Sequence, residues 1–171
     1  MSDVFYLRPI DPPISPGDIP EMLKIAGGCF DLHRVDWRHS FLATDGRRML
    51  CWYSAPDVES ARVALRKLGS DLNAVWAGAV IGDAPNAPPV PAANFVAEIL
   101  IGEPLPEDRL PRTASAFGGY DAALVRGFVS ASRMQFVGAF RAIDEAAVRV
   151  ALESAGMSAK AVWACTPVTP K

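Results

Sequence analysis

The stretches ALRKLGSDLNAVWAG (residues 64–78) and ALESAGMSAKAVWAC (residues 151–165) share an Ala-Leu pair, a Gly and an Ala-Val-Trp-Ala run at the same spacing. They lie 87 positions apart, and the match extends without a gap over 38–77 and 125–164, where twelve of the forty positions are identical. Further upstream the offset becomes 91, so the first copy has four extra residues before Trp37. The chain is therefore an internal duplication.

Composition excludes several classes of protein. The length of 171 residues fits one ordinary domain or two very small ones, and half of the residues are apolar, which indicates a buried core. A net charge of −2 offers no basic face for nucleic acid. Prolines interrupt every apolar run before the roughly 20 residues of a membrane span. The N-terminus has no export-signal pattern and the three cysteines have no paired spacing, so we expect a cytoplasmic protein with free thiols.

Each copy is expected to have the order strand, helix, strand, strand, helix, strand. Short β-rich runs ended by turn residues occupy residues 4–10, 38–43, 48–54 and 74–81 in the first copy, and the second copy opens with one at 94–101. The Asp-Gly pair at 45–46 is a strong hairpin signal between two of these strands.

Helix boundaries are marked by capping residues. The first helix is expected to begin near Asp18, with Pro20 tolerated in its first turn. Asp57 is the expected N-cap of the second helix, and Gly69 its left-handed stop. The second copy repeats this pattern with Asp144 as cap and Gly156 as stop.

A βαββαβ unit is the ferredoxin-like motif, in which two helices cover one face of an antiparallel sheet. The other face is expected to be apolar too, because these strands scarcely alternate with polar residues, and one copy alone would expose a large apolar surface. We therefore predict an α+β fold of two tandem ferredoxin-like repeats, packed sheet to sheet as an intrachain dimeric α+β barrel. The repeats are expected at 1–81 and 95–171, joined by a Pro- and Ala-rich linker at 82–94.

His39 and Cys51 are the residues that suggest metal chemistry, since imidazole and thiolate are ligands for nickel, zinc or copper. If the turn at 45–46 is a two-residue loop, His39 lies opposite Trp52 and Cys51 points to the other face. A three-residue loop at 44–46 places His39 opposite Cys51. Both faces of this hairpin are apolar, so the sequence leaves the two registers open. The alternative to a metal site is a buried thiol and a hydrogen-bonded imidazole with structural roles.

Three charged residues, Arg8, Glu98 and Arg126, occur within apolar strands. Aligning the first strands of the two copies gives Arg8 and Glu98 matching positions, and Arg126 falls where the first copy has His39. A charge in such a strand needs an opposite charge or a wet cavity. Either Glu98 forms an ion pair with one of the arginines between the copies, or all three line a ligand pocket between the sheets.

The four tryptophans divide by copy. Trp76 and Trp163 repeat, so we expect them to pack in the core or between the sheets. Trp37 and Trp52 have no aromatic counterpart in the second copy. They either pack or form one aromatic wall of a ligand site, and Trp52 joins the three charged residues as a candidate ligand contact.

The run VDWRHSFLATDGRRMLCWYSAPD (residues 35–57), followed by a helix, a Gly and a last strand, resembles a known family. It is similar to a bacterial domain of unknown function whose members include a small nickel-binding protein. The resemblance covers residues 5–81 and, more weakly, 95–166. It implies ferredoxin-like subunits packed sheet to sheet, the dimeric α+β barrel arrangement.

The positions that fit the family pattern are Trp37, His39, Ser40, Asp45, Gly46, Cys51, Tyr53, Ala55, Pro56 and Asp57. The chain departs from it at Ser54, where the family has Glu, and in a second helix without His. The family's first-strand Glu is Arg8 in the first copy and Glu98 in the second. The resemblance implies a site for nickel or another divalent transition metal, for which His39, Cys51 and Glu98 are the available ligands.

Three functions compete. The first is a non-enzymatic protein that binds a nickel-like metal ion or a small ligand between the sheets, and we rank it first. The second is an enzyme similar to the cofactor-free monooxygenases or haem-degrading proteins of the same barrel group, with His39 or Glu98 as base and an arginine as anion holder. The third is an interaction role, with the chain as a monomeric pseudo-dimer or a homodimer.

Overall fold

The structure is a computed structural model that describes residues 1–82, 93–109 and 121–170. The linker predicted at 82–94 lies almost entirely outside these residues, and so does the second-copy counterpart of the first helix at 110–119. Within the described ranges, no helix is both long enough and apolar enough to cross a membrane.

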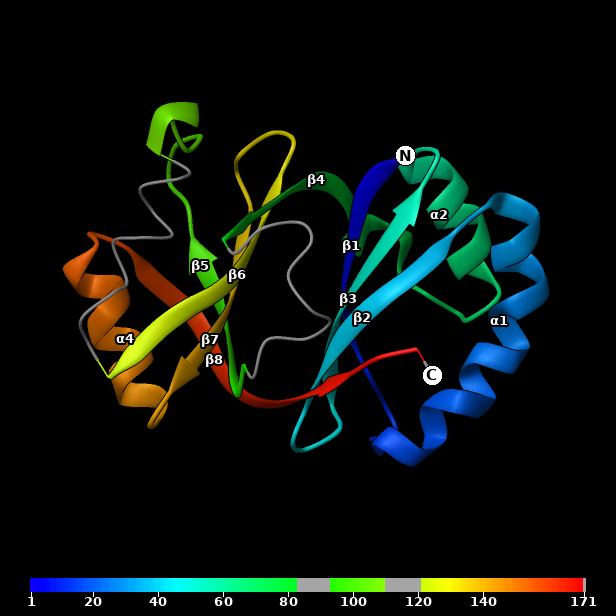
Figure 1. Ribbon diagram of the computed structural model, residues 1–171, viewed down its shortest axis with the longest axis horizontal. Helices are drawn as coiled ribbons and strands as arrows, with labels where there is room; N and C mark the ends of the chain where they lie inside the picture. The colour runs from blue at the N-terminus through cyan, green and yellow to red at the C-terminus, as the bar shows by residue number, and fades with distance from the viewer. Residues whose placement is uncertain (83–92, 110–120, 171) are drawn as a thin grey trace. The chain divides into compact units, whose positions relative to one another are not determined.

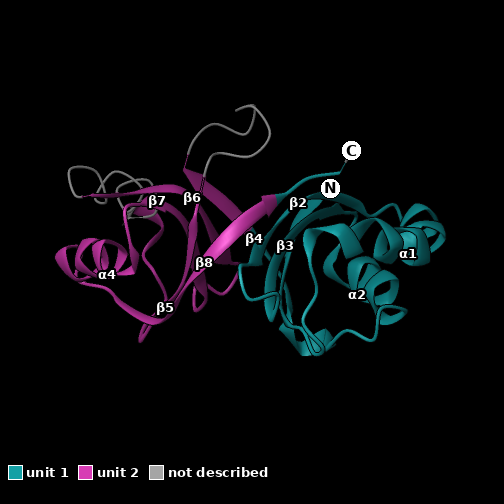
Figure 2. Cartoon of the chain, turned by 90° about the horizontal axis from the view of Figure 1, so that it is seen from below, with its two compact units in different colours: residues 1–78, 168–171 teal, residues 79–167 magenta. Residues whose placement is uncertain are grey.

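The chain divides into two compact units, which Figure 2 shows in different colours. Unit 1 contains residues 1–78 and 168–171, and unit 2 contains residues 79–167. The first repeat makes up nearly all of unit 1, and the second repeat makes up most of unit 2.

Unit 1 has the complete predicted order of elements (Figure 1). These elements are β1 (Ser2–Pro9), α1 (Ile19–His33), β2 (Asp36–Ala43), β3 (Arg48–Ala55), α2 (Val58–Arg66) and the first four residues of β4 (Val75–Gly82). The strands pair antiparallel in the order β4-β1-β3-β2. The strand and helix positions predicted for the first copy are thus confirmed.

Helices α1 and α2 lie on one face of the unit 1 sheet (Figure 1). Along β1, Val4 and Tyr6 belong to the core beneath these helices. Phe5 points to the opposite face, where its ring centre lies 5.8 Å from that of Trp76. Both Val4 and Phe5 are fully buried. The second face of this strand is therefore apolar, as the lack of alternation in the sequence predicted.

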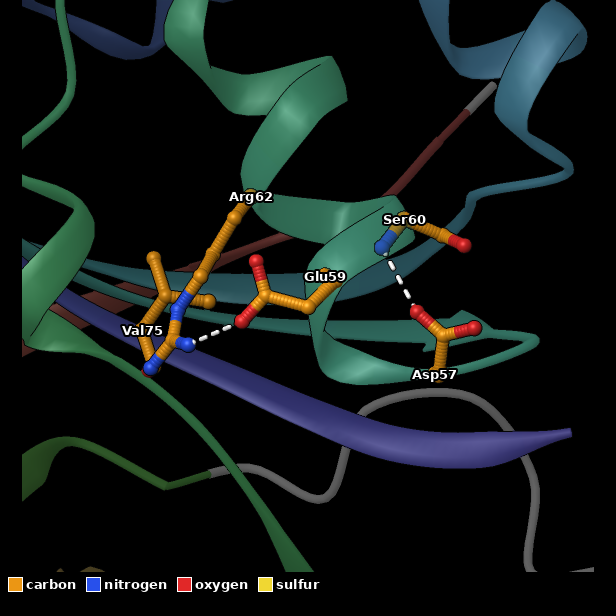
Figure 3. Close-up of polar contacts among 5 residues, drawn as sticks. All are labelled: Asp57, Glu59, Ser60, Arg62 and Val75. Carbon is orange, nitrogen blue, oxygen red and sulfur yellow. Dashed lines mark hydrogen bonds and ion pairs between the residues drawn. The ribbon is translucent and has the colours of Figure 1, made fainter.

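Helix α2 begins directly after the predicted cap Asp57 (Figure 3) and ends at Arg66, three residues before the predicted stop Gly69. The carboxylate of Asp57 accepts a hydrogen bond from the backbone N–H of Ser60 at 2.7 Å, which satisfies a donor in the first turn. Gly69 follows the helix with φ of +67°, in the left-handed region that favours glycine. Between them, Arg62 binds Glu59 and also donates to the backbone carbonyl of Val75 at 3.0 Å.

Unit 2 repeats the sheet and the second helix. Its described elements are β5 (Phe95–Leu100), β6 (Ala122–Ser130), β7 (Phe136–Ala142), α4 (Glu145–Ser154) and β8 (Ser158–Val168). The strands pair antiparallel in the order β8-β5-β7-β6. Asp144 caps α4 by accepting from the backbone N–H of Ala147 at 2.8 Å, and Gly156 follows with φ of +73°. Both caps were predicted.

Strand register confirms the duplication at the level of single residues. Phe5 pairs with Trp76 in unit 1, and Val96 pairs with Trp163 in unit 2. The strand pairing also shifts register at equivalent places in the two repeats. The shift lies directly before His39 where β2 pairs with β3, and directly before Arg126 where β6 pairs with β7. The chain has the predicted α+β class, with two ferredoxin-like repeats.

Candidate ligand pocket in the first repeat

The pairing of β2 with β3 decides between the two registers left open by the sequence. His39 lies opposite Trp52, and Ser40 lies opposite Cys51. The turn is closed by a hydrogen bond from the backbone N–H of Gly46 to the carbonyl of Ala43 at 2.8 Å, and the loop spans residues 44–47. This register is the one in which His39 and Cys51 point to opposite faces of the sheet.

His39 lies on the face away from the helices. Its ring is 5.1 Å from the ring of Phe41 and 5.1 Å from that of Trp52, edge-on to both. Trp52 in turn donates its indole N–H to the carboxylate of Asp3 at 2.8 Å. The imidazole is only 3 % exposed, so it packs as part of an aromatic layer.

The structure therefore corrects one part of the predicted metal site at His39, Cys51 and Glu98, because His39 and Cys51 point to opposite faces of the sheet and do not share one ion. Cys51 belongs to the core beneath the helices, on the other side of the sheet from His39. Glu98 accepts a hydrogen bond from the indole of Trp163 at 3.3 Å in unit 2. In the described part of the chain, His, Cys, Asp and Glu form no group of three or more that could hold a metal ion. Binding of nickel or of another divalent metal ion stays a prediction.

The predicted match between Arg8 and Glu98 is also wrong, by one residue. Arg8 pairs with Met49 in unit 1, whereas Ile99 pairs with Phe136, the counterpart of Met49, in unit 2. Ile99 is thus the counterpart of Arg8, and Leu7 is the counterpart of Glu98. Arg8 therefore lies on the helix-covered face of its sheet, and Glu98 lies on the uncovered face of its own.

The tryptophans support this corrected match. The indole N–H of Trp163 donates to the carboxylate of Glu98. The first repeat has Leu7 at the position equivalent to Glu98, and its side chain offers Trp76 no acceptor. Accordingly, the indole nitrogen of Trp76 is buried without a hydrogen-bond partner among the described residues.

The match of Arg126 with His39 is confirmed, since their pairing partners Ala139 and Trp52 are equivalent. Arg126 is buried, and register places it with Glu98 on one face of the unit 2 sheet, on the strands to either side of β7. Their roles as an ion pair or as ligand contacts stay predictions. Trp52 and Arg8, predicted to share a ligand, lie on opposite faces of one sheet, so that part of the set is corrected.

A pocket of about 30 Å³ lies between α1 and the sheet within unit 1, enough for about two water molecules. Side chains from α1, from the turn after α2 and from strands β1, β2 and β3 line it. They are Arg8, Ile19, Met22, Leu23, Phe30, Trp37, Ser40, Met49, Cys51, Tyr53 and Leu68. The apolar members are those expected beneath an amphipathic helix. The polar members are what distinguish this pocket from ordinary core.

The polar groups of the pocket are hydrogen-bond donors at neutral pH. Burial raises the pKa of the Cys51 thiol, although hydrogen bonds from Ser40 and Tyr53 and the charge of Arg8 act in the opposite direction. Burial, and then the neighbouring Cys51, raise the pKa of the Tyr53 hydroxyl well above its usual value. Both groups therefore keep their protons. Ser40 accepts from the indole of Trp37 at 2.9 Å, which leaves its own hydroxyl hydrogen to donate.

Among the described residues that line this pocket, Arg8 carries the only formal charge. It is half-buried, and its guanidinium carbon lies 5.8 Å from the centre of the Tyr6 ring. The Nε atom is buried and has no hydrogen-bond partner in the part of the chain that the structure describes. Among those same residues no acidic side chain forms an ion pair with Arg8. A partly desolvated cation without a counter-charge is costly unless something else neutralises it.

The second repeat shows what the fold requires at these positions. Its register equivalents are Ile99 for Arg8, Gly127 for Ser40, Gly138 for Cys51 and Phe140 for Tyr53. A Cβ atom on Gly138 would lie 2.5 Å from Cε2 of Phe140, so the ring of Phe140 fills this space. Phe140 is fully buried in the core of unit 2. At these four described positions the second repeat thus has no polar side chain.

The sequence identified Arg8 and Cys51 as candidate site residues but did not indicate that they line the same pocket. It also did not indicate that Ser40 and Tyr53 line this pocket. Cys51 and Tyr53 are two residues apart on β3, so they share a face, and this spacing could have identified them as a pair. Four of the pocket residues, Trp37, Ser40, Cys51 and Tyr53, are also among those that fit the family pattern.

Comparisons with known proteins agree on fold. No protein-family model matches the chain, and no curated protein sequence matches it. A solved structure of a chlorite dismutase-like protein has a TM-score of 0.50 at 14% identity, over 96% of this chain and 94% of that chain. This likeness shows the predicted fold class, the dimeric α+β barrel.

Two further structures cover nearly all of the chain with lower scores. A mutant chlorite dismutase from Candidatus Nitrospira defluvii has a TM-score of 0.48 at 9% identity, over 99% of this chain and 93% of that chain. A monooxygenase-like protein from Lactobacillus acidophilus has a TM-score of 0.42 at 9% identity, over 99% and 97%.

Proposed function

We propose that this chain is a small-ligand-binding protein whose site is the pocket beneath α1 in unit 1. The observation that carries the proposal is the difference between the repeats. Arg8, Ser40, Cys51 and Tyr53 replace apolar or absent side chains at positions where the second repeat packs without them. Buried polar groups that a fold does not need cost free energy, which a ligand that binds them offsets.

The site is a binding site rather than a catalytic one in this proposal. The thiol of Cys51 has a raised pKa, so it is a poor nucleophile at neutral pH. The Tyr53 hydroxyl, with its pKa raised further, does not serve as a base under the same conditions. What the pocket offers is a set of donors beside an apolar wall.

Ligand titrations of the wild type and of a variant whose pocket is filled by a larger side chain on α1 test the proposal. Small aliphatic acids, amides, alcohols and amines are titrated into the protein, and the backbone amide resonances of Ser40, Cys51 and Tyr53 are followed by NMR. We expect at least one class to shift them. Met22→Trp places a large ring in the pocket and should abolish the shifts.

The matched control is Ile25→Trp, on the same helix at a side chain that is 61% exposed, which should bind as the wild type does. Far-ultraviolet circular dichroism confirms that both variants are folded. If no compound moves the three resonances, or if Met22→Trp binds unchanged, the pocket is not a ligand site.

An enzyme similar to cofactor-free monooxygenases or haem-degrading proteins is the second candidate. Its support is the fold shared with a chlorite dismutase-like structure, and a shared fold does not determine chemistry. Incubation with haem or with aromatic polyketides, followed by absorption spectroscopy, tests it. A spectral change with turnover would favour the enzyme, and unchanged spectra would leave the binding function.

A further inference from the structure

From the charge and size of this pocket, we propose that its ligand is a small monocarboxylate with a short apolar tail. The inference rests on the proposed function, and it specifies what that site selects. It follows from four properties of the lining: its donors, its charge, its volume and the position of its apolar side chains.

The donors favour an acceptor-only ligand. Arg8, Ser40, Cys51 and Tyr53 all carry N–H, O–H or S–H groups, because the thiol and the phenol stay protonated, and a ligand would replace the hydrogen bonds that Ser40 and Tyr53 make to the thiol. A carboxylate oxygen accepts from each of these groups and donates to none. An amine is protonated at neutral pH and would bring a second cation next to Arg8.

The charge favours an anion over a neutral acceptor. No aspartate or glutamate lines the pocket, and Arg8 has no acidic partner among the described residues. A planar guanidinium presents a fork of N–H groups that matches the two oxygens of a carboxylate. The buried Nε of Arg8, which has no partner in the described part of the chain, is one prong of that fork.

The volume limits the ligand to a small molecule, and the apolar side chains give it a direction. About 30 Å³ holds a carboxylate head group and little more. Ile19, Met22 and Leu23 of α1 form the apolar wall, together with Leu68 after α2. A short aliphatic tail would lie along this wall, where each buried methylene contributes about fourfold in affinity.

The test compares molecules of one shape and different charge. Propionate, propionamide and propylamine are titrated against the full chain at constant ionic strength, using calorimetry and the amide resonances of Ser40, Cys51 and Tyr53. We expect propionate to bind at least about tenfold more tightly than propionamide, as a charge-assisted hydrogen bond implies, and propylamine not to bind. Acetate should bind about fourfold more weakly than propionate.

Two variants of one residue separate charge from geometry. Arg8→Met keeps the aliphatic stem and should weaken propionate binding by at least about tenfold without affecting propionamide. Arg8→Lys keeps the charge without the planar fork and should bind propionate with intermediate affinity. Circular dichroism checks that each variant is folded.

The failures are distinguishable. If propionamide binds as tightly as propionate, or nitrate binds as tightly as propionate, the monocarboxylate inference is wrong. The proposed function would still stand as long as Met22→Trp abolishes that binding. If none of these probes moves the pocket resonances, the monocarboxylate inference fails, and the broader panel of neutral and cationic compounds decides the proposed function by itself.

Discussion

Replacing Arg62 by Met should destabilise the protein far more than the same change at Arg149, although the two arginines occupy equivalent positions in the repeats. Arg62 donates to the buried backbone carbonyl of Val75 at 3.0 Å, besides forming an ion pair with Glu59 (Figure 3). Arg149 binds only Glu145, one turn away on α4, and its side chain is 42% exposed. Methionine keeps the aliphatic stem in both cases, so packing changes little.

The expected magnitudes follow from these contacts. A hydrogen bond from a charged group contributes about 1.5–3 kcal/mol, so losing the Val75 contact should lower the free energy of unfolding by about 2 kcal/mol. An exposed pair between residues four apart on a helix contributes about 0.3–0.5 kcal/mol, which is the loss expected for Arg149→Met. The buried Nε of Arg62 has no partner among the described residues, and its removal offsets part of the first loss.

Urea denaturation of both variants, followed by circular dichroism, measures these differences. The comparison is internal, because both substitutions remove one arginine from the second helix of a repeat in the same chain. Losses that agree within about 0.3 kcal/mol, which is the additivity error of such measurements, would refute the claim that Arg62 anchors the start of β4.

Two further outcomes follow from glycine geometry and from a buried thiol. Gly46→Ala should destabilise the protein by more than Gly69→Ala, because both have φ near +70° but a Cβ at Gly46 would lie 2.1 Å from the carbonyl oxygen of Ile14, whereas one at Gly69 would meet nothing within 4 Å. Equal unfolding midpoints in urea would contradict this difference. Burial raises the pKa of the Cys165 thiol from 9.0 to about 12. Between these pH values the folded state keeps a proton that the unfolded state loses. The stability that the thiol contributes below pH 9 should therefore be lost as the pH rises to about 12. Cys165→Val should reduce this slope by about 1.4 kcal/mol per pH unit, and parallel curves of unfolding free energy against pH would show that the thiol is not responsible.

The fold could be predicted because local signals agreed with one another. Asp57 and Asp144 are caps one repeat apart, Gly69 and Gly156 are the matching stops, and the structure places all four at helix ends. Each signal depends on a few neighbouring residues and on backbone geometry that a sequence specifies directly.

The site could not be predicted because it depends on register. A shift of one residue between β2 and β3 moves Cys51 from one face of the sheet to the other, and both faces are apolar, so hydrophobic alternation carried no information. The same shift of one residue in the alignment of the first strands paired Arg8 with Glu98. In neither of these first strands do apolar and polar residues alternate clearly. The number of positions that separates equivalent residues of the two copies also changes from 91 to 87 before the next strand, so the alignment of the first strands was not fixed by the rest of the repeat.

The duplication itself separates what the fold requires from what function requires. A polar residue in a core is ambiguous when it is seen once, because a network of such groups can also determine a unique packing. Here a second copy of the fold packs Phe140 against Gly138 where the first copy has Tyr53 and Cys51. The described part of the second copy therefore packs without the polar set, and among the described residues no acidic side chain forms an ion pair with Arg8. The proposed carboxylate would supply that counter-charge, so the charge of the ligand, and not its presence alone, is the property to measure.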